Sequence, residues 1–123
     1  KMSGSIQPSI FYLAFNMSDK VVGGYSKKAQ KLRQAISIAQ NEEEYISIFM
    51  NGRGIPAQSP IPPGIFGYQK AKEGTNPIIY DWIKGKRVRK PLEVAKKLLA
   101  QAGYPNGISK KTGKPLVLYY DTT

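Results

Sequence analysis

Two consecutive helix-start signals constrain the fold of this chain more than any other feature. Ser26 precedes an apolar stripe with helical spacing, and its hydroxyl can accept a hydrogen bond from an unpaired amide of the first turn. Asn41 restarts the pattern, with Glu44 three residues later as in a capping box, and Gly52 can take the left-handed conformation that ends a helix. The sequence therefore predicts helices over about 26–39 and 41–51. Their predicted buried faces are Ala29, Leu32, Ile36 and Ala39 in the first, and Tyr45, Ile46, Phe49 and Met50 in the second.

A third helix is predicted over about 91–102. Pro91 suits the first helical turn, where its missing N–H costs nothing, and Gly103 followed by Pro105 ends the segment. Its apolar stripe consists of Leu92, Ala95, Leu98, Leu99 and Ala102.

Two short apolar runs predict buried strands at about 10–16 and 115–120. Apolar side chains on both faces of such a run are typical of a strand that is covered on both sides. The resulting order is strand, helix, helix, long loop, helix, strand, which indicates α/β or α+β layering. We expect the α/β class, with residues 1–123 in a single domain.

The segment between the second and third helices is rich in glycine and proline at 52–67. It could serve as a proline-rich ligand of an SH3-type domain. Its apolar residues favour instead an ordered loop that packs back on the core: Ile55, Ile61, Ile65 and Phe66. Over 69–90, the apolar residues Ile78, Ile79, Tyr80 and Trp82 predict an anchored turn or short helix, followed by an exposed basic run.

The composition argues against an enzyme. The chain contains no cysteine and no histidine, which excludes a thiol nucleophile, a disulfide framework and a Cys-type zinc site, and removes the usual general base. Helix capping accounts for Glu42, Glu43 and Glu44, and Gly52-Arg53-Gly54 lacks the Lys-Ser/Thr ending of a phosphate loop. We expect a binding domain without catalytic residues, cofactor or metal.

The formal net charge of +11 raises the alternative of a small basic nucleic-acid-binding domain. The positive residues form three separate groups without aromatic residues placed for base stacking. They are Lys84, Lys86, Arg87, Arg89 and Lys90; Lys27, Lys28 and Lys31; and Lys110, Lys111 and Lys114. This dispersion favours a solvated surface and no nucleic-acid partner.

Four segments, in this order, resemble the family 5 extracellular solute-binding proteins, the peptide and nickel receptors of ABC importers. They are Phe11–Asn16, Leu32–Ala39 with the next helix start at Asn41, the loop Gly52–Gly64, and Ala95–Gly107 with the strand after it. Two departures from the family pattern are the Gln40-Asn41 pair and a longer 69–90 segment.

The resemblance implies a type II periplasmic-binding-protein-like lobe. Members of the family have two lobes joined by a hinge, and this chain resembles the part just after the crossing into the second, C-terminal lobe. The signal peptide and first lobe would then be missing, and the fragment could self-associate through the face left uncovered. The implied function is capture of a peptide by lobe closure and delivery to membrane permease subunits. The implied location is periplasmic, or extracellular and membrane-attached in a Gram-positive host.

The resemblance also indicates two candidates for lining the ligand cleft, Tyr12 and Asn16, on the strand next to the hinge. The alternative is that Tyr12 belongs to the core and Asn16 bonds the following loop. Arg33 is interpreted as structural, tying its helix to a neighbouring carboxylate or carbonyl.

Overall fold

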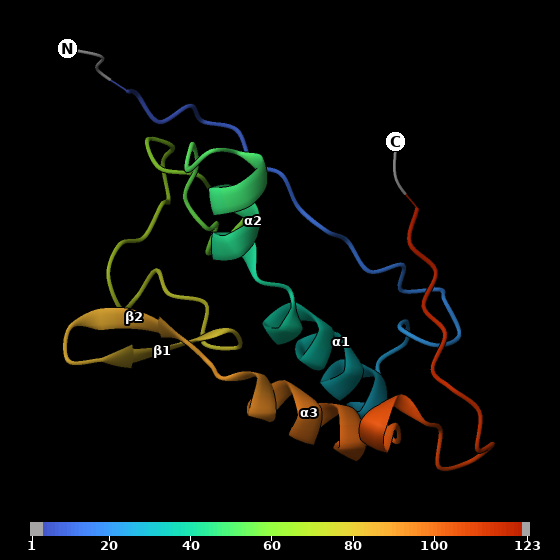
Figure 1. The fold of residues 1–123 in the computed structure, drawn as a ribbon. Helices are drawn as coiled ribbons and strands as arrows, with labels where there is room; N and C mark the ends of the chain where they lie inside the picture. The colour runs from blue at the N-terminus through green and yellow to red at the C-terminus, as the bar shows by residue number, and fades with distance from the viewer. Residues whose placement is uncertain (1–3, 122–123) are drawn as a thin grey trace. The chain divides into compact units, whose positions relative to one another are not determined.

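Three helices, one β-hairpin and a short 3-10 turn make up the regular structure of residues 4–121, which a computed structural model describes (Figure 1). In chain order they are α1 (Lys27–Ala39), α2 (Glu42–Phe49), β1 (Tyr80–Ile83), β2 (Lys86–Arg89), α3 (Leu92–Gln101) and the 3-10 turn η1 (Pro105–Gly107). The mixed helix and strand content agrees with the expected class. Across residues 4–121, none of the helices has the length and apolar content needed to cross a bilayer.

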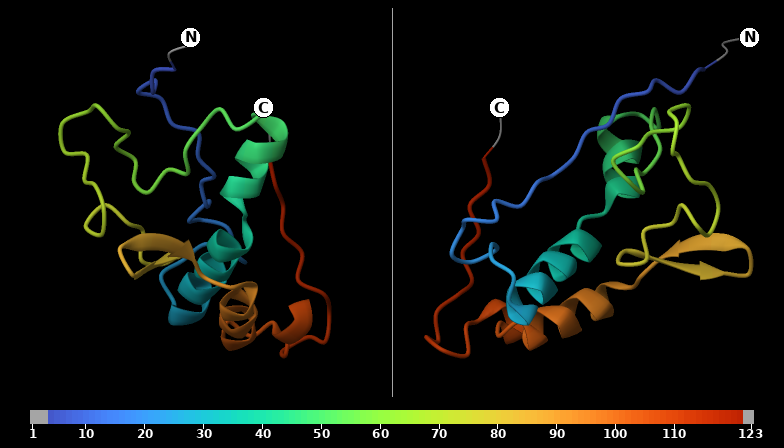
Figure 2. Two further views of the ribbon diagram at one scale, coloured as in Figure 1. Left: turned by 60° about the vertical axis from the view of Figure 1, so that its left-hand side comes forward. Right: turned by 180° about the vertical axis from the view of Figure 1, so that it is seen from behind.

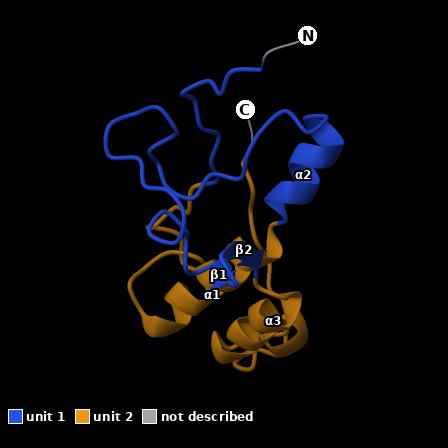
Figure 3. Ribbon diagram, turned by 90° about the vertical axis from the view of Figure 1, so that its left-hand side faces the viewer, with its two compact units in different colours: residues 1–13, 41–89 blue, residues 14–40, 90–123 orange. Residues whose placement is uncertain are grey.

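The chain divides into two compact units (Figure 3). One, the α2–hairpin unit, comprises residues 1–13 and 41–89, and the other, the α1–α3 unit, comprises residues 14–40 and 90–123. Each unit therefore combines two stretches that are distant in the sequence.

The packing of α1 against α3 forms the core of the α1–α3 unit, and the two helices lie side by side in every view (Figures 1 and 2). Leu32 is 1% exposed, and Ala35, Ile38, Ala95 and Ala102 are also buried. The buried face of α1 is thus the Leu32, Ala35, Ile38 row. The sequence analysis predicted Ile36 and Ala39 for this face, next to the Ala35 and Ile38 that are buried instead; Ala39 is exposed.

The helix ends confirm the predicted signals. Ser26 Oγ accepts from Ala29 N at 3.1 Å, and Asn41 Oδ1 accepts from Glu44 N at 3.2 Å. At the end of α3, Gly103 has a φ of +105°, and the amide of Tyr104 donates to Leu99 O at 3.0 Å. That 6→1 bond closes a Schellman motif, which explains why the helix stops where glycine stands.

The β1–β2 hairpin corrects the expectation of a turn or short helix over 78–82. Tyr80 pairs with Arg89 and Ile83 with Lys86 in an antiparallel register. Lys84 and Gly85 form the two-residue turn, with φ of 48° and 76°. Two consecutive positive φ angles are the mark of a type I′ turn, whose twist matches that of paired strands. Gly85 was the available signal for it.

The predicted strands at 10–16 and 115–120 are wrong: neither segment is a strand in the described residues. Both are extended and exposed, with Tyr12 at 81% and Tyr119 at 88%. Near the second segment the structure has one isolated bridge, between Ile108 and Pro115. A strand is stable only with a hydrogen-bonded neighbour, and among the described residues the second run has one only at its start, where Leu116 N donates to Gly107 O at 2.7 Å, while the first run has none.

The apolar residues of α2 and of the 52–67 loop are also less buried than predicted. Tyr45 and Phe49 are exposed, and their rings contact each other at a centroid distance of 5.2 Å instead of entering a core. In the loop, Phe66 is fully exposed, and a polar contact anchors the segment: Gln58 Oε1 accepts from Asn76 N at 3.0 Å.

Replacing Leu32 with alanine should lower the free energy of unfolding by about 2–5 kcal/mol, because it leaves a cavity between α1 and α3. The matched control is Leu92→Ala on α3, a leucine that is 50% exposed, where we expect a loss below about 1 kcal/mol. Urea unfolding followed by circular dichroism measures both. Equal losses would contradict the placement of the core.

Candidate functional site

The loop over 16–25 is held by its own polar side chains. Asn16 Oδ1 accepts from Ser18 N at 3.0 Å, and Asp19 Oδ1 accepts from the amides of Val21 and Val22 at 2.7 and 2.9 Å. Hydrogen bonds from Val22 and then Val21 lower the pKa of Asp19, because they favour its charged form. The sequence analysis recognised a loop here but not the role of Asp19.

Arg33 fastens this loop to α1. Its Nη1 donates to Val22 O at 2.7 Å and to Gly24 O at 2.9 Å. The interpretation of Arg33 as a structural residue that ties its helix to a carbonyl is confirmed. Gly23 fits the same turn because a Cβ at that position would lie 2.4 Å from the carbonyl oxygens of both Asp19 and Met17.

An open, largely apolar groove lies beside the loop, within the α1–α3 unit. Its volume is about 410 Å³, and it is lined by Ser18–Val22 on one side and Val117–Tyr119 on the other. The two walls are the ordered loop and the extended C-terminal segment, which pass near each other in Figure 1.

The two predicted ligand-lining residues lie in different units. Tyr12 belongs to the α2–hairpin unit and is 81% exposed in this chain. Asn16 belongs to the α1–α3 unit and bonds the following loop, as its alternative interpretation stated. The side-chain nitrogen of Asn16 donates no hydrogen bond to the described residues, so it can still donate to a ligand.

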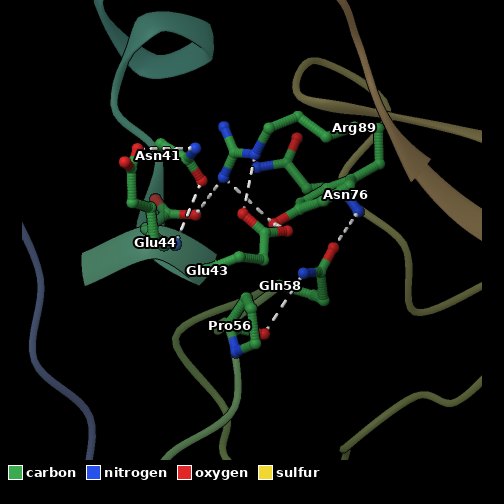
Figure 4. A network of polar contacts seen from close by, with 9 residues as sticks. Asn41, Glu43, Glu44, Pro56, Gln58, Asn76 and Arg89 are labelled. Atoms are coloured by element: carbon green, nitrogen blue, oxygen red, sulfur yellow. Dashed lines mark hydrogen bonds and ion pairs between the residues drawn. The ribbon is translucent and has the colours of Figure 1, made fainter. Parts of the chain in front are cut away.

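A polar network in the α2–hairpin unit connects the start of α2 to the hairpin (Figure 4). Arg89 Nε contacts Glu43 at 2.7 Å, and its Nη2 contacts Glu42 at 3.0 Å. Tyr80 donates to Glu43 at 2.6 Å, and the Arg89 guanidinium lies 5.1 Å from the centroid of the Tyr80 ring. The sequence analysis assigned the glutamates to helix capping alone and missed this second role, because Arg89 is 46 residues from Glu43.

The environment of the network shifts several pKa values. Burial and then the hydrogen bond to Glu43 raise the pKa of Tyr80 to about 12. Burial also raises the pKa of Glu42, despite the nearby Arg89. For Glu43, burial acts in the same direction, but hydrogen bonds from Tyr80, its own backbone and Arg89 outweigh it and lower the pKa. All of these groups are paired with one another, so the network has a structural role: it holds the start of α2 to the hairpin.

Within residues 4–121, no group of three or more acidic side chains is placed to hold a metal ion. Within the α1–α3 unit, the described residues combine an ordered loop with an open, largely apolar groove.

Comparison with known proteins gives the family. The model for the bacterial extracellular solute-binding proteins, family 5 Middle, matches residues 1–123. The chain belongs to this family. Family 5 solute-binding proteins are binding proteins rather than enzymes. No solved structure matches the chain significantly.

Two curated family 5 relatives bind different solutes, according to their names. Heme-binding protein A of Haemophilus influenzae is 33% identical over 99 residues, covering 80% of this chain and 15% of the relative. Glutathione-binding protein GsiB of Escherichia coli K12 is 32% identical over 104 residues, covering 83% of this chain and 17% of the relative. The chain thus spans less than a fifth of the length of the curated relatives that it matches.

The Gly23→Ala substitution should destabilise the 16–25 loop, because the new Cβ would collide with two backbone oxygens. We expect a loss of about 1–3 kcal/mol in unfolding free energy. Gly4→Ala is the control, since nothing lies within 4 Å of a Cβ there and its φ is not positive. Thermal unfolding compares them, and an unchanged Gly23 variant would refute the close approach.

Tyr80 should ionise near pH 12 in the folded chain, well above the ordinary value of 10. Because its folded pKa is raised, the stabilisation it contributes is complete below pH 10 and is lost as pH rises toward 12. The difference in tyrosinate absorbance between the wild type and Tyr80→Phe reports this titration.

Glu43→Gln should move the titration of Tyr80 toward pH 10 by removing a negative charge beside its hydroxyl. The control Glu44→Gln changes a neighbouring glutamate that contacts Asn41 and not Tyr80. A wild-type Tyr80 that titrates near 10 would be incompatible with the network.

Proposed function

We propose that residues 1–123 form part of the C-terminal lobe of a two-lobe solute-binding protein that serves an ABC importer. The observation that carries this proposal is the family 5 match over the whole chain. In such a receptor, the ligand contacts both lobes, stabilises the closed form and is delivered to a membrane permease.

The two extended segments support the placement in a lobe of type II periplasmic-binding-protein architecture. Residues 10–16 and 117–120 have the apolar composition of covered strands but lack ladder partners among the described residues. We propose that strands outside these 123 residues pair with them, and that the two compact units then belong to one domain. The first lobe of the same protein is the principal partner, and permease subunits are the second.

We propose short peptides as the ligand class. Glutathione, named in one relative, is itself a tripeptide, which supports a peptide-sized site. The other relative is named for heme, so the same family framework accommodates a larger, flatter solute. A periplasmic location, or an extracellular one with membrane attachment, follows from delivery to a permease.

Tyr12 and Asn16 remain our candidates for ligand contact. An exposed phenol can stack on a peptide bond and bond to it through its hydroxyl, which is why tyrosine is frequent in binding sites. The Asn16 amide nitrogen can donate to a peptide carbonyl while Oδ1 stays bonded to Ser18. Both residues lie at the ends of the short segment where the chain passes from one unit to the other.

The 123-residue chain alone should not bind glutathione or short peptides in titration calorimetry at micromolar concentration. Half of the ligand-contacting surface and the closure that excludes water would be missing, and each loss of about 1.4 kcal/mol weakens binding tenfold. Saturable micromolar binding by the chain alone would show that the site lies entirely within it.

In the two-lobe protein, Tyr12→Ala and Asn16→Ala should each lower the affinity for the solute by about tenfold, which corresponds to the loss of one good contact. Tyr25→Ala is the matched control, because Tyr25 is a tyrosine that is 92% exposed outside the 10–16 segment. Unchanged affinity in both test variants would remove Tyr12 and Asn16 from the site without affecting the family assignment.

A further inference from the structure

The tip of the β1–β2 hairpin is a basic, partly apolar element that the ligand-binding proposal does not use. We define the hairpin tip as residues 83–88. Its turn residues Lys84 and Gly85 lie at the outer end of the hairpin, away from α2 (Figure 2). It carries three cationic side chains and no acidic one, namely Lys84, Lys86 and Arg87.

The two faces of the hairpin differ in how their cations are held. On the inner face, Arg87 lies 5.8 Å from the Tyr80 ring and donates to Thr75, and Arg89 binds two glutamates. On the outer face and at the turn, Lys86 and Lys84 are exposed, and their side chains form no hydrogen bond or ion pair with other described residues. The arginines stabilise the hairpin, which leaves the two lysines available to a partner.

Aliphatic side chains stand beside these lysines. Ile83 pairs with Lys86 across the ladder and is 49% exposed, and Val88 on the same face is 42% exposed. The acidic Asp81 shares this face and stands directly opposite Val88 in the ladder; it is two residues further from the turn than Ile83, roughly 7 Å at about 3.3 Å per residue. The end of the hairpin therefore presents positive charge and apolar surface together.

We propose that the hairpin tip docks on an anionic lipid surface, an interaction separate from capture of the solute. Lysine ammonium groups above a shallow apolar surface are the combination found in segments that lie at a membrane interface. The aliphatic side chains enter the headgroup boundary, and the lysines remain among the phosphates.

An acidic protein surface fits this tip less well. Fixed carboxylates on a protein are best matched by the planar guanidinium of arginine, which forms two parallel hydrogen bonds, whereas lysine acts as a mobile point charge. Here the arginines are already engaged on the inner face, and the free cations are lysines. A diffuse layer of lipid phosphates requires no fixed pairing geometry.

The expected affinity is modest and depends on salt. Each basic side chain close to an anionic surface strengthens binding about fivefold, so the two lysines together contribute about 25-fold. This attraction falls as the Debye length shortens from about 10 Å at 0.1 M salt to about 3 Å at 1 M. Such docking would orient the protein at a membrane rather than anchor it there.

Sedimentation with lipid vesicles tests the proposal with the 123-residue chain. The probes are vesicles with about 30 mol% phosphatidylglycerol, vesicles of phosphatidylcholine alone, and soluble polyglutamate as an acidic polypeptide. The Lys84→Gln/Lys86→Gln variant should bind the anionic vesicles about 25-fold more weakly. The control Lys110→Gln/Lys111→Gln removes the same charge from two exposed lysines in the other unit and should change binding less than about threefold.

A second pair of measurements separates lipid from acidic protein. Ile83→Thr/Val88→Thr keeps β-branched residues in both strands, so the hairpin is retained, and it should weaken vesicle binding while leaving polyglutamate binding unchanged. Equal losses in the two lysine variants would mean that net charge alone is responsible and would overturn the proposal. If the threonine variant binds vesicles as tightly as the wild type does, and polyglutamate binds as tightly as the vesicles, the partner of the tip would be an acidic protein instead.

Discussion

The packing of α1 on α3 is the contact on which the α1–α3 unit depends. Leu32 is almost completely buried there, and the next residue, Arg33, donates hydrogen bonds to two carbonyls of the 16–25 loop. The loop in turn forms one wall of the groove beside Val117–Tyr119. A single helix therefore supplies both the core residue and the clamp that positions the candidate binding surface.

The α2–hairpin unit combines two buried residues, Ile79 and Tyr80, with charge and hydrogen bonding. Arg89 joins Glu42 and Glu43 on α2 to the hairpin, while the aromatic residues of α2 remain exposed. Ion pairs that are partly exposed stabilise a fold only slightly. The exposed apolar residues and the unpaired extended segments have one common explanation in our proposal: their packing partners belong to the rest of a two-lobe protein.

Local signals in the sequence predicted the helices well because each signal acts within a few residues. Ser26, Asn41 and Gly103 cap or end their helices as their chemistry requires. The strands at 10–16 and 115–120 were wrong because apolar composition indicates that a segment can be covered, not that a neighbour is present. The Arg89 network and the groove could not be predicted, since both depend on residues distant in sequence. Of the site, the role of Arg33 was confirmed, and ligand contact by Tyr12 and Asn16 stays a prediction.

Hydrogen exchange of the backbone amides at 10–16 and 117–120 tests the central claim, that this chain is a lobe segment completed by further strands. Amides without ladder partners exchange quickly, whereas those in a paired, covered strand open only with the surrounding structure. We expect fast exchange in the 123-residue chain and protection greater by about a thousandfold or more in the two-lobe protein. Equally fast exchange of both segments in the two-lobe protein would contradict the account.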